Sequence, residues 1–521
     1  MAENRLGSLA KQTAIYGLSS IIGRFLNYML VPIHTHRMAA ESGGYGIVTN
    51  LYAYTALLLV ILTFGMETTF FRFSNKENVN PNKAFSTAGL SVGFVSLVFL
   101  ILVSVFLKPI AGALDYALHP EFVEIMAIIV AFDAFQSILF ARLRYENRPI
   151  KFMTLKLSFI VLSLLLNIFI FYVAPYLQGR FPTIMEWYHT SYQVGYIFIA
   201  NLICTTLVFL GFIPEIKKLR TGIDRDLLKE MLKYTWPILL LGLAGILNQV
   251  ADKIVFKKIV PGLEGEEQLG IYGACVKIAM IMAMITQAFR FAYEPIVFSG
   301  VKDKGQREMY EQAMKYFIIF TLLAFLMVVG YIDILKYIVR NPDYWVGLKV
   351  VPVVMAAEIM MGIYFNLSFW YKLIDKTIWG AWFSGIGCVV LLAVNFLFVP
   401  KYGFMACAWG GVAGYGVAMV TSYIVGQKYY PLNYPLKEIA YYTIFAVVAF
   451  VVMMLLREHL SMWLSIVCNT GFIVLFVGMI IKKDLPLSSL PVIGRRFRKK
   501  PGYSGSPGNS GNPGNPGESR E

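Results

Sequence analysis

Charged side chains inside long apolar segments are the residues of this sequence best placed to do chemistry. The segment from Thr13 to Pro32 is long enough to cross a bilayer, yet it holds Arg24 near its middle. A polar stripe at helical pitch runs along it, made of Thr13, Gly17, Ser20, Arg24 and Asn27. A cation at the bilayer centre costs on the order of 3 kcal/mol, so this stripe must face a helix bundle or a water-filled cavity. Arg24 is therefore either an anion-binding group or the partner of a neighbouring helix.

Two more cations lie within a later apolar segment, residues 269–292. Lys277 is about 12 Å from one end of that segment at 1.5 Å per residue, and Arg290 is near the other end. Lys277 has no acidic neighbour at helical spacing, which favours a functional role over an ion pair. Arg24, Lys277 and Arg290 are the predicted substrate-binding cations, suited to a polyanionic headgroup.

Other polar groups lie at similar depth in the predicted spans, and each has two interpretations. They either couple transport to a cation or fix helix packing through ion pairs and hydrogen bonds. The residues concerned are Asp133, Asn248, Asp252, Lys253 and Glu358.

The sequence offers no metal or catalytic cluster. All five cysteines fall within predicted spans and none forms a CxxC pair, so we interpret them as small buried apolar residues. His34 and His36 are two residues apart but have no third ligand nearby, which favours a polar pair at the membrane interface. We expect no metal, no cofactor and no catalytic residue.

Composition places these residues in a multi-pass membrane protein. The 521 residues are 57% hydrophobic and 15% charged, with a mean hydropathy of +0.62. The net charge of +15 does not indicate nucleic-acid binding, because Lys and Arg cluster between apolar segments. At about 20 residues per crossing we predict fourteen spans, near 13–32, 45–66, 84–107, 121–141, 153–174, 191–213, 235–256, 269–292, 313–334, 348–369, 378–399, 404–426, 438–456 and 461–481.

The distribution of Lys and Arg among the loops predicts the orientation. Most of the Lys and Arg residues of the loops fall on one side if both termini are cytoplasmic, as the positive-inside rule requires. Residues 214–233 form a basic amphipathic link, predicted to lie on the cytoplasmic surface, halfway through the first twelve spans. Residues 482–521 form a basic and then Gly/Pro/Asn-rich tail, predicted to be disordered and cytoplasmic.

An internal repeat divides the spans into two lobes. A shift of 227 residues superposes Tyr45 and Gly46 on Tyr272 and Gly273, and three more identities follow, at Phe64, Glu67 and Phe71. We therefore predict an all-α protein with two pseudo-symmetric six-helix lobes, residues 1–213 and 234–426. Two extra carboxy-terminal spans, residues 427–481, follow them.

The chain resembles the Wzx-type polysaccharide or O-antigen flippases of the multidrug/oligosaccharidyl-lipid/polysaccharide (MOP) exporter superfamily. The likeness rests on GLSSIIGRFLNYMLVPIHTHRM in the first span, GGYGI opening the second and GMETTFFRF closing it. It implies a transporter, not an enzyme, that moves an undecaprenyl-diphosphate-linked oligosaccharide to the outer leaflet of the bacterial inner membrane by alternating access. Such a protein serves O-antigen, capsule or exopolysaccharide biosynthesis. It implies membrane lipids, a coupling H⁺ or Na⁺ and the glycan polymerase machinery as partners.

Three alternatives stay open. A flippase for lipid II, the peptidoglycan precursor, would have a similarly charged cavity. A multidrug or cation antiporter of the same superfamily would use Asp133 and Glu358. A membrane glycosyltransferase or polymerase would need a large outer loop with catalytic residues, and the predicted outer loops are short.

Overall fold

The computed structural model describes residues 28–298, 305–374 and 376–484, and its regular elements there are all helical. Within these residues, thirteen helical segments are long and apolar enough to cross a membrane, and they match the second to fourteenth predicted spans. The first predicted span lies outside the described residues except at its end, where helix α2 (Leu30–Arg37) begins. Arg24 also lies outside them. The predicted class, an all-α polytopic membrane protein, is confirmed.

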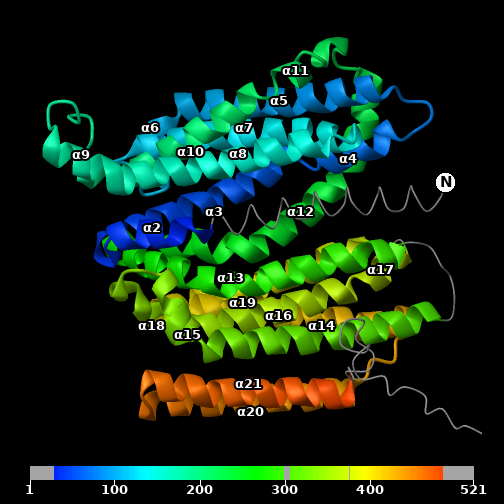
Figure 1. Ribbon diagram of the computed structural model, residues 1–521. Helices are drawn as coiled ribbons and strands as arrows, with labels where there is room; N and C mark the ends of the chain where they lie inside the picture. The colour runs from blue at the N-terminus through cyan, green and yellow to red at the C-terminus, as the bar shows by residue number, and fades with distance from the viewer. Residues whose placement is uncertain (1–27, 299–304, 375, 485–521) are drawn as a thin grey trace, which may run out of the picture.

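Two bundles of roughly parallel and antiparallel helices lie one above the other in Figure 1. The amino-terminal lobe contains α3 (Gly44–Thr63), α5 (Pro81–Val105), α7 (Pro120–Tyr145), α8 (Pro149–Ile168) and α10 (Gln193–Leu210). The carboxy-terminal lobe contains α12 (Arg225–Ile259), α13 (Gly262–Phe298), α14 (Gly305–Gly330), α16 (Val350–Leu367), α18 (Ile378–Tyr402) and α19 (Phe404–Tyr429).

Short elements connect the spans. They are η1 (Ala40–Ser42), α4 (Met66–Ser74), α6 (Leu107–Ala113), η2 (Phe169–Val173), α9 (Ala174–Arg180), η3 (Thr190–Tyr192), α11 (Ile213–Ile216), η4 (Leu219–Thr221), α15 (Ile332–Leu335), η5 (Lys336–Ile338), η6 (Pro342–Lys349) and α17 (Phe369–Leu373).

Local sequence determines where several of the helices begin. Proline occupies the first position of α5, α7 and α8, where its missing N–H costs no hydrogen bond. The Asp224 side chain caps α12 by accepting a hydrogen bond from the Leu227 backbone N–H.

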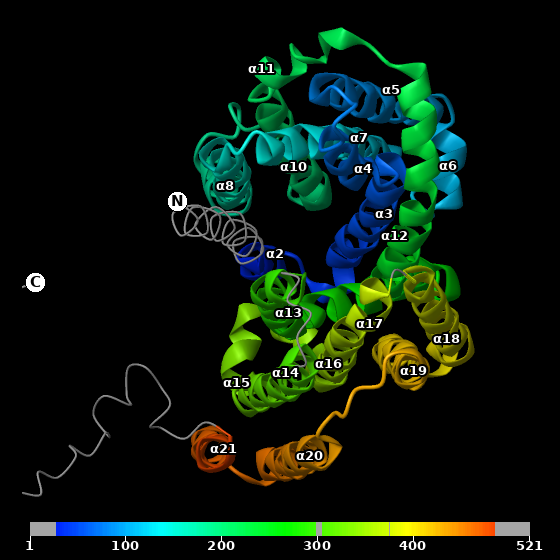
Figure 2. The same ribbon diagram turned by 90° about the vertical axis from the view of Figure 1, so that its right-hand side faces the viewer.

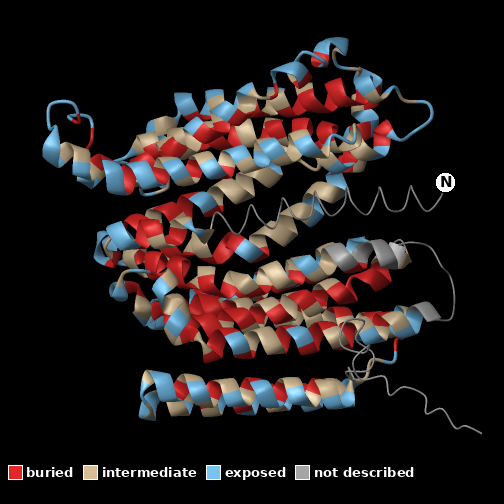
Figure 3. Cartoon of the chain, in the orientation of Figure 1, coloured by how far each residue is buried: buried red, intermediate tan, exposed pale blue. Residues whose placement is uncertain are grey.

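The last two spans, α20 (Leu436–His459) and α21 (Met462–Lys483), lie outside the two lobes (Figure 2). Figure 3 shows few buried residues along them, as expected of helices that face lipid on most sides. Polar contacts hold them against the end of α14 and against α15. The Asn469 amide donates to the Gly330 carbonyl at 2.9 Å, and Arg457 donates twice to the Asp333 carboxylate at 2.9 Å. Within the described residues, these contacts dock the pair of helices on the carboxy-terminal lobe.

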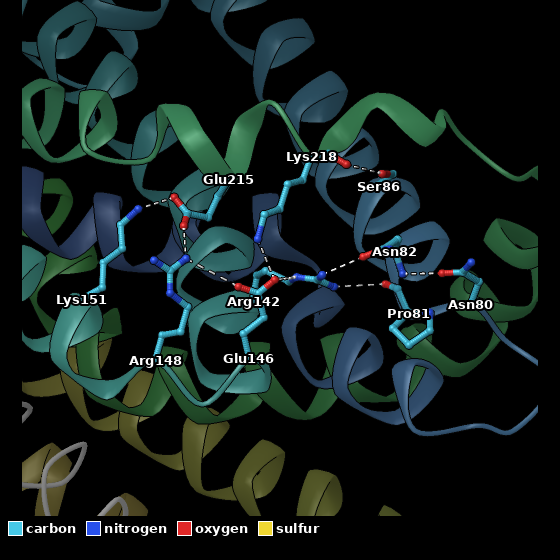
Figure 4. A network of polar contacts seen from close by, with 10 residues as sticks. All are labelled: Asn80, Pro81, Asn82, Ser86, Arg142, Glu146, Arg148, Lys151, Glu215 and Lys218. Carbon is cyan, nitrogen blue, oxygen red and sulfur yellow. Dashed lines mark hydrogen bonds and ion pairs between the residues drawn. The ribbon is translucent and has the colours of Figure 1, made fainter.

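The predicted link between the lobes is fastened to the amino-terminal lobe. Figure 4 shows the network: the fully buried Glu215 accepts from Arg148 at 2.8 Å and from Lys151 at 2.6 Å. Glu146 accepts from Arg142 at 2.8 Å and from Lys218 at 2.9 Å. Burial opposes ionisation of Glu146, but these two cations outweigh it and hold its pKa below the usual value. The chain from α11 to η4 therefore belongs to the amino-terminal lobe.

Helix α12 belongs to both lobes. Its first turns bury Leu227 and Met231 in the core of the amino-terminal lobe, and the Thr235 hydroxyl lies 2.9 Å from that of Thr69 on α4. Farther along, the Asn248 amide donates to the Ser384 carbonyl of α18 at 2.7 Å. Pro237 lies between these anchor points and interrupts the helical hydrogen bonds. Any relative movement of the lobes must therefore deform this stretch of α12.

Candidate functional site

A cavity of about 830 Å³ lies between the lobes and is lined by residues of both. Seven of the eight predicted site residues line it: Asp133, Asn248, Asp252, Lys253, Lys277, Arg290 and Glu358. Their placement follows from physics, since a polar group in an apolar span avoids lipid by facing the bundle interior. The eighth, Arg24, lies outside the described residues.

Tight packing of α3 against α13 closes one end of this cavity. We call it the outer end, because it carries residues 33–44 and 257–268, which the sequence predicts to face outward. A Cβ added at Gly46 would lie 1.8 Å from the Glu266 carbonyl oxygen, and one at Gly273 would lie 2.3 Å from the Thr49 hydroxyl. Only glycine permits such an approach. Gly46 and Gly273 are also partners in the predicted repeat, so corresponding positions of the two lobes meet here.

A polar cluster joins the lobes at the same end. Lys257, only 3% exposed, lies 2.7 Å from the Glu266 carboxylate, and its ammonium is 3.5 Å from the centroid of the Tyr116 ring. The Asn50 side chain donates to the Lys253 carbonyl at 2.8 Å and accepts from the Tyr116 hydroxyl at 2.9 Å. We call Asn50, Tyr116, Lys257 and Glu266 the outer latch. Opening this end would require the contacts that cross between the lobes to break, namely those of Lys257 with Tyr116 and of Asn50 with Lys253.

Two of the predicted polar residues hold helices together. The Asn248 carbonyl accepts from the Tyr415 hydroxyl of α19 at 2.9 Å, besides the amide bond to Ser384 described above. Asp252 accepts from Tyr272 at 2.8 Å and pairs with the neighbouring Lys253 at 3.0 Å. These contacts favour the packing interpretation of Asn248 and Asp252.

The remaining ionisable groups face the cavity differently. Within the part of the chain that the structure describes, Lys277, Asp133 and Glu358 have no ion pair. Asp133 lies on α7 of the amino-terminal lobe, and Glu358 lies on α16 of the other lobe. The guanidinium of Arg290 lies 4.5 Å from the centroid of the Phe365 ring, which holds it at the far end of α13. The described cations of the cavity thus all come from α12 and α13.

The amino-terminal wall adds neutral polar groups that we did not predict. The Asn201 amide donates to the Tyr52 hydroxyl at 2.8 Å, while its carbonyl oxygen is buried without a partner among the described residues. The His34 ring lies 2.7 Å from the Asn167 amide oxygen, and His36 stacks separately on Tyr172. The two histidines therefore do not act as a pair. A polar side chain isolated in an apolar span is the signal by which the sequence pointed to Arg24 and Asn248. Asn167 and Asn201 carry the same signal, because each is an isolated amide in an apolar span.

The described residues contain no group of three or more His, Cys, Asp or Glu side chains arranged to hold a metal ion. The cysteines are free thiols, four of them buried and Cys468 half-buried. The described lining of the cavity offers cations, carboxylates, amides and hydroxyls as ligand-binding groups.

Comparison with known proteins gives one family and one fold. The model of a family described as "polysaccharide biosynthesis protein" matches residues 9–300. A comparison with curated protein sequences found no match. Among solved structures, the lipid II flippase MurJ in an inward closed conformation superposes with a TM-score of 0.67 at 15% identity, covering 89% of this chain and 98% of that chain.

Two solved multidrug transporters are also similar in fold. An inward-facing MATE family transporter of the MOP superfamily gives a TM-score of 0.56 at 14% identity, covering 80% of this chain and 94% of that one. The MATE multidrug transporter DinF-BH gives a TM-score of 0.56 at 16% identity, covering 80% of this chain and 95% of that one. At these identities the superpositions establish the fold alone, which the chain shares with MurJ and with these MATE transporters.

Proposed function

Because the chain belongs to the polysaccharide biosynthesis protein family, we propose that it flips a lipid-linked oligosaccharide across the bacterial cytoplasmic membrane. The lipid is an undecaprenyl diphosphate, and the product supplies O-antigen, capsule or exopolysaccharide assembly. The protein works as a transporter by alternating access, without catalytic chemistry. Both chain termini lie in the cytoplasm.

The observation that carries this proposal is the cationic wall of the central cavity. Lys277 and Arg290 line it from α13, and Lys253 lines it from α12. Partly desolvated ammonium and guanidinium groups favour phosphate and carboxylate over neutral solutes. Arg24 falls on the polar stripe of the first predicted span, and we propose that it faces the same cavity. A diphosphate is the anion that every undecaprenyl-linked glycan carries.

The state of the cavity supports cytoplasmic loading. The outer latch and the α3–α13 contact close the end that the sequence predicts to face outward. The inner leaflet, where such glycans are assembled, would then have access to the cavity. Asp133 and Glu358 are the groups that we propose for coupling to H⁺ or Na⁺, because each is a carboxylate without an ion pair among the described residues.

A flippase for lipid II is the second candidate. It is favoured by the superposition with MurJ, which extends over 98% of that chain and has a higher TM-score than either multidrug transporter described above. Lipid II also carries a diphosphate, so the cationic wall suits both substrates. The choice between them rests on the glycan.

Complementation of glycan export tests the proposal. Arg24→Ala, Lys277→Ala and Arg290→Ala should each reduce export, and Arg24→Lys should restore little of it if the planar guanidinium clamps a diphosphate. Export is normalised to membrane abundance in the same samples, because an arginine that only pairs with another helix would lower abundance instead. Normal export by all three alanine variants would overturn the proposal. Rescue of a strain depleted of its lipid II flippase would favour the second candidate.

A further inference from the structure

The exposed face of α12 changes from basic to apolar along one line. Arg225, Lys229 and Lys233 are four residues apart, so they lie on one side of the helix, and all three are exposed. Trp236 and Leu240 continue this line and are 62% and 42% exposed. The opposite side packs into the core of the amino-terminal lobe, as described above. We call these five residues the α12 stripe.

The α12 stripe lies where the helix enters the bilayer. Helix α12 is long and apolar enough to cross a membrane, and only 22% of its most apolar window is buried in the protein. No residue of the stripe belongs to the described lining of the central cavity, so its apolar end faces lipid. Tryptophan is typical of the boundary between hydrocarbon and headgroups. At 1.5 Å per residue, Lys233 and Lys229 lie about 4.5 Å and about 10.5 Å outside that boundary, where their long side chains reach the headgroups.

The three cations of the α12 stripe have no ion pair within the described residues, unlike many cations near them. Lys76 and Lys83 each lie 3.4 Å from a carboxylate near the start of α12. Figure 4 shows further cations of this end paired with Glu146 and Glu215. Asp226 is an unpaired carboxylate of the first turn, and three cations against this one carboxylate leave a net charge of +2. The positive-inside rule explains why cations lie on this side, but it does not explain why these three are left without partners.

We propose that the α12 stripe binds an anionic phospholipid of the phosphatidylglycerol class. Lys229 and Lys233 hold the lipid phosphate by charge-assisted hydrogen bonds, and Trp236 packs against the glycerol and the upper acyl chains. A zwitterionic phospholipid also carries a phosphate, but its own ammonium group cancels that charge, so a face of net positive charge selects the anionic lipid. The bound lipid is not cargo, because the stripe lies outside the described cavity lining. Binding here requires only that α12 crosses the membrane and does not depend on the proposed function.

Quenching of a fluorophore beside the stripe measures which lipid lies there. The fluorophore is attached to a cysteine at Leu232, an exposed neighbour of the stripe, in the full-length protein with Cys468→Ala. The protein is reconstituted in phosphatidylcholine vesicles that contain increasing amounts of phosphatidylglycerol or phosphatidylcholine with brominated chains, which quench on contact. Brominated phosphatidylglycerol should quench at a lower mole fraction. Lys229→Gln with Lys233→Gln should reduce this preference by about fivefold per cation, which corresponds to about 1 kcal/mol for each basic residue at a membrane surface.

Lys217→Gln with Arg220→Gln is the matched control, because it removes two exposed cations from the same end of the protein but outside the stripe. It should leave the preference for phosphatidylglycerol unchanged. Lys229→Arg with Lys233→Arg keeps the charge and should also retain the preference, which guards against a folding defect in the glutamine variant. Three results would overturn the proposal: equal quenching by the two lipids in the otherwise unchanged protein, equal loss of preference in the two glutamine variants, or no quenching by either lipid.

Discussion

Replacing Gly46 with alanine should shift the transporter away from the state closed at its outer end. The added Cβ would lie 1.8 Å from the Glu266 carbonyl oxygen, whereas real Cβ contacts are essentially never under 3.0 Å, so α3 and α13 must part by about 1.2 Å. The obstacle is backbone, which cannot rotate away as a side chain would. Overpacking of this kind costs about 1–3 kcal/mol.

Under the proposed alternating access, this cost falls on one state alone. In a state open at the outer end, α3 and α13 are apart and the methyl group meets nothing. The equilibrium should therefore move toward that state by about fivefold to 150-fold, since 1.4 kcal/mol corresponds to a factor of ten. Spin labels at Leu118 and Lys401, exposed at the outer ends of the two lobes, should report a longer distance in the Gly46→Ala protein.

Gly385→Ala is the control for the substitution itself. It is also a glycine inside a helix, but a Cβ there would have no atom within 4 Å. It should leave the distance distribution unchanged. If Gly46→Ala gives the wild-type distribution while the protein is folded, then the α3–α13 contact does not govern closure and the reasoning fails.

Three further predictions follow from the described contacts. Lys257→Gln removes the cation of the outer latch and leaves Glu266 half-buried without its partner. The distribution of distances between spin labels at Leu118 and Lys401 should therefore broaden toward longer values. An unchanged distribution would show that the outer latch does not control closure. The pKa of Asp333 is lowered, because the opposing effect of burial is outweighed by hydrogen bonds from Arg457 and Lys336. The ionised Asp333 carboxylate therefore stabilises the folded protein fully above the ordinary aspartate pKa of 3.8, and this stabilisation is lost as the pH falls below that value. The melting temperature of the wild type should therefore fall more than that of Asp333→Asn between about pH 6 and about pH 3, and equal falls would count against the linkage. Single cysteines at Asn78 and Glu308 should be protected from impermeant thiol reagents in intact cells while one at Leu118 reacts, because the positive-inside rule predicts that the most basic loops face the cytoplasm. The opposite labelling pattern would reverse the orientation.

The sequence was sufficient for the described spans and for the Asp, Glu, Lys and Arg residues of the cavity lining. Each span must satisfy its own backbone, so its length and hydropathy locate it without any knowledge of neighbours. A buried charge such as Lys277 or Glu358 must likewise face inward wherever its helix packs. Whether these groups bind substrate stays a prediction, since their position alone does not identify a ligand.

What the sequence did not reveal depends on pairs of distant residues. The His34–Asn167 contact joins positions 133 residues apart, and the approach of Gly46 to Glu266 requires that α3 and α13 be neighbours. A glycine can occur in an apolar span for many reasons, and only the packed structure shows that Gly46 permits the close approach of α3 to α13. The role of Lys257 was hidden for the same reason, because its partner Tyr116 lies in the other lobe.

The division of α12 between the lobes affects how the protein is made. The amino-terminal lobe needs Leu227 and Met231 to complete its core, although these residues follow the last of its own spans in the chain. During synthesis that lobe therefore cannot finish folding until the next span has left the ribosome and entered the membrane. Two fragments divided at Gly222 would separate the first lobe from part of its core, so the intact chain should assemble more efficiently than co-expressed halves.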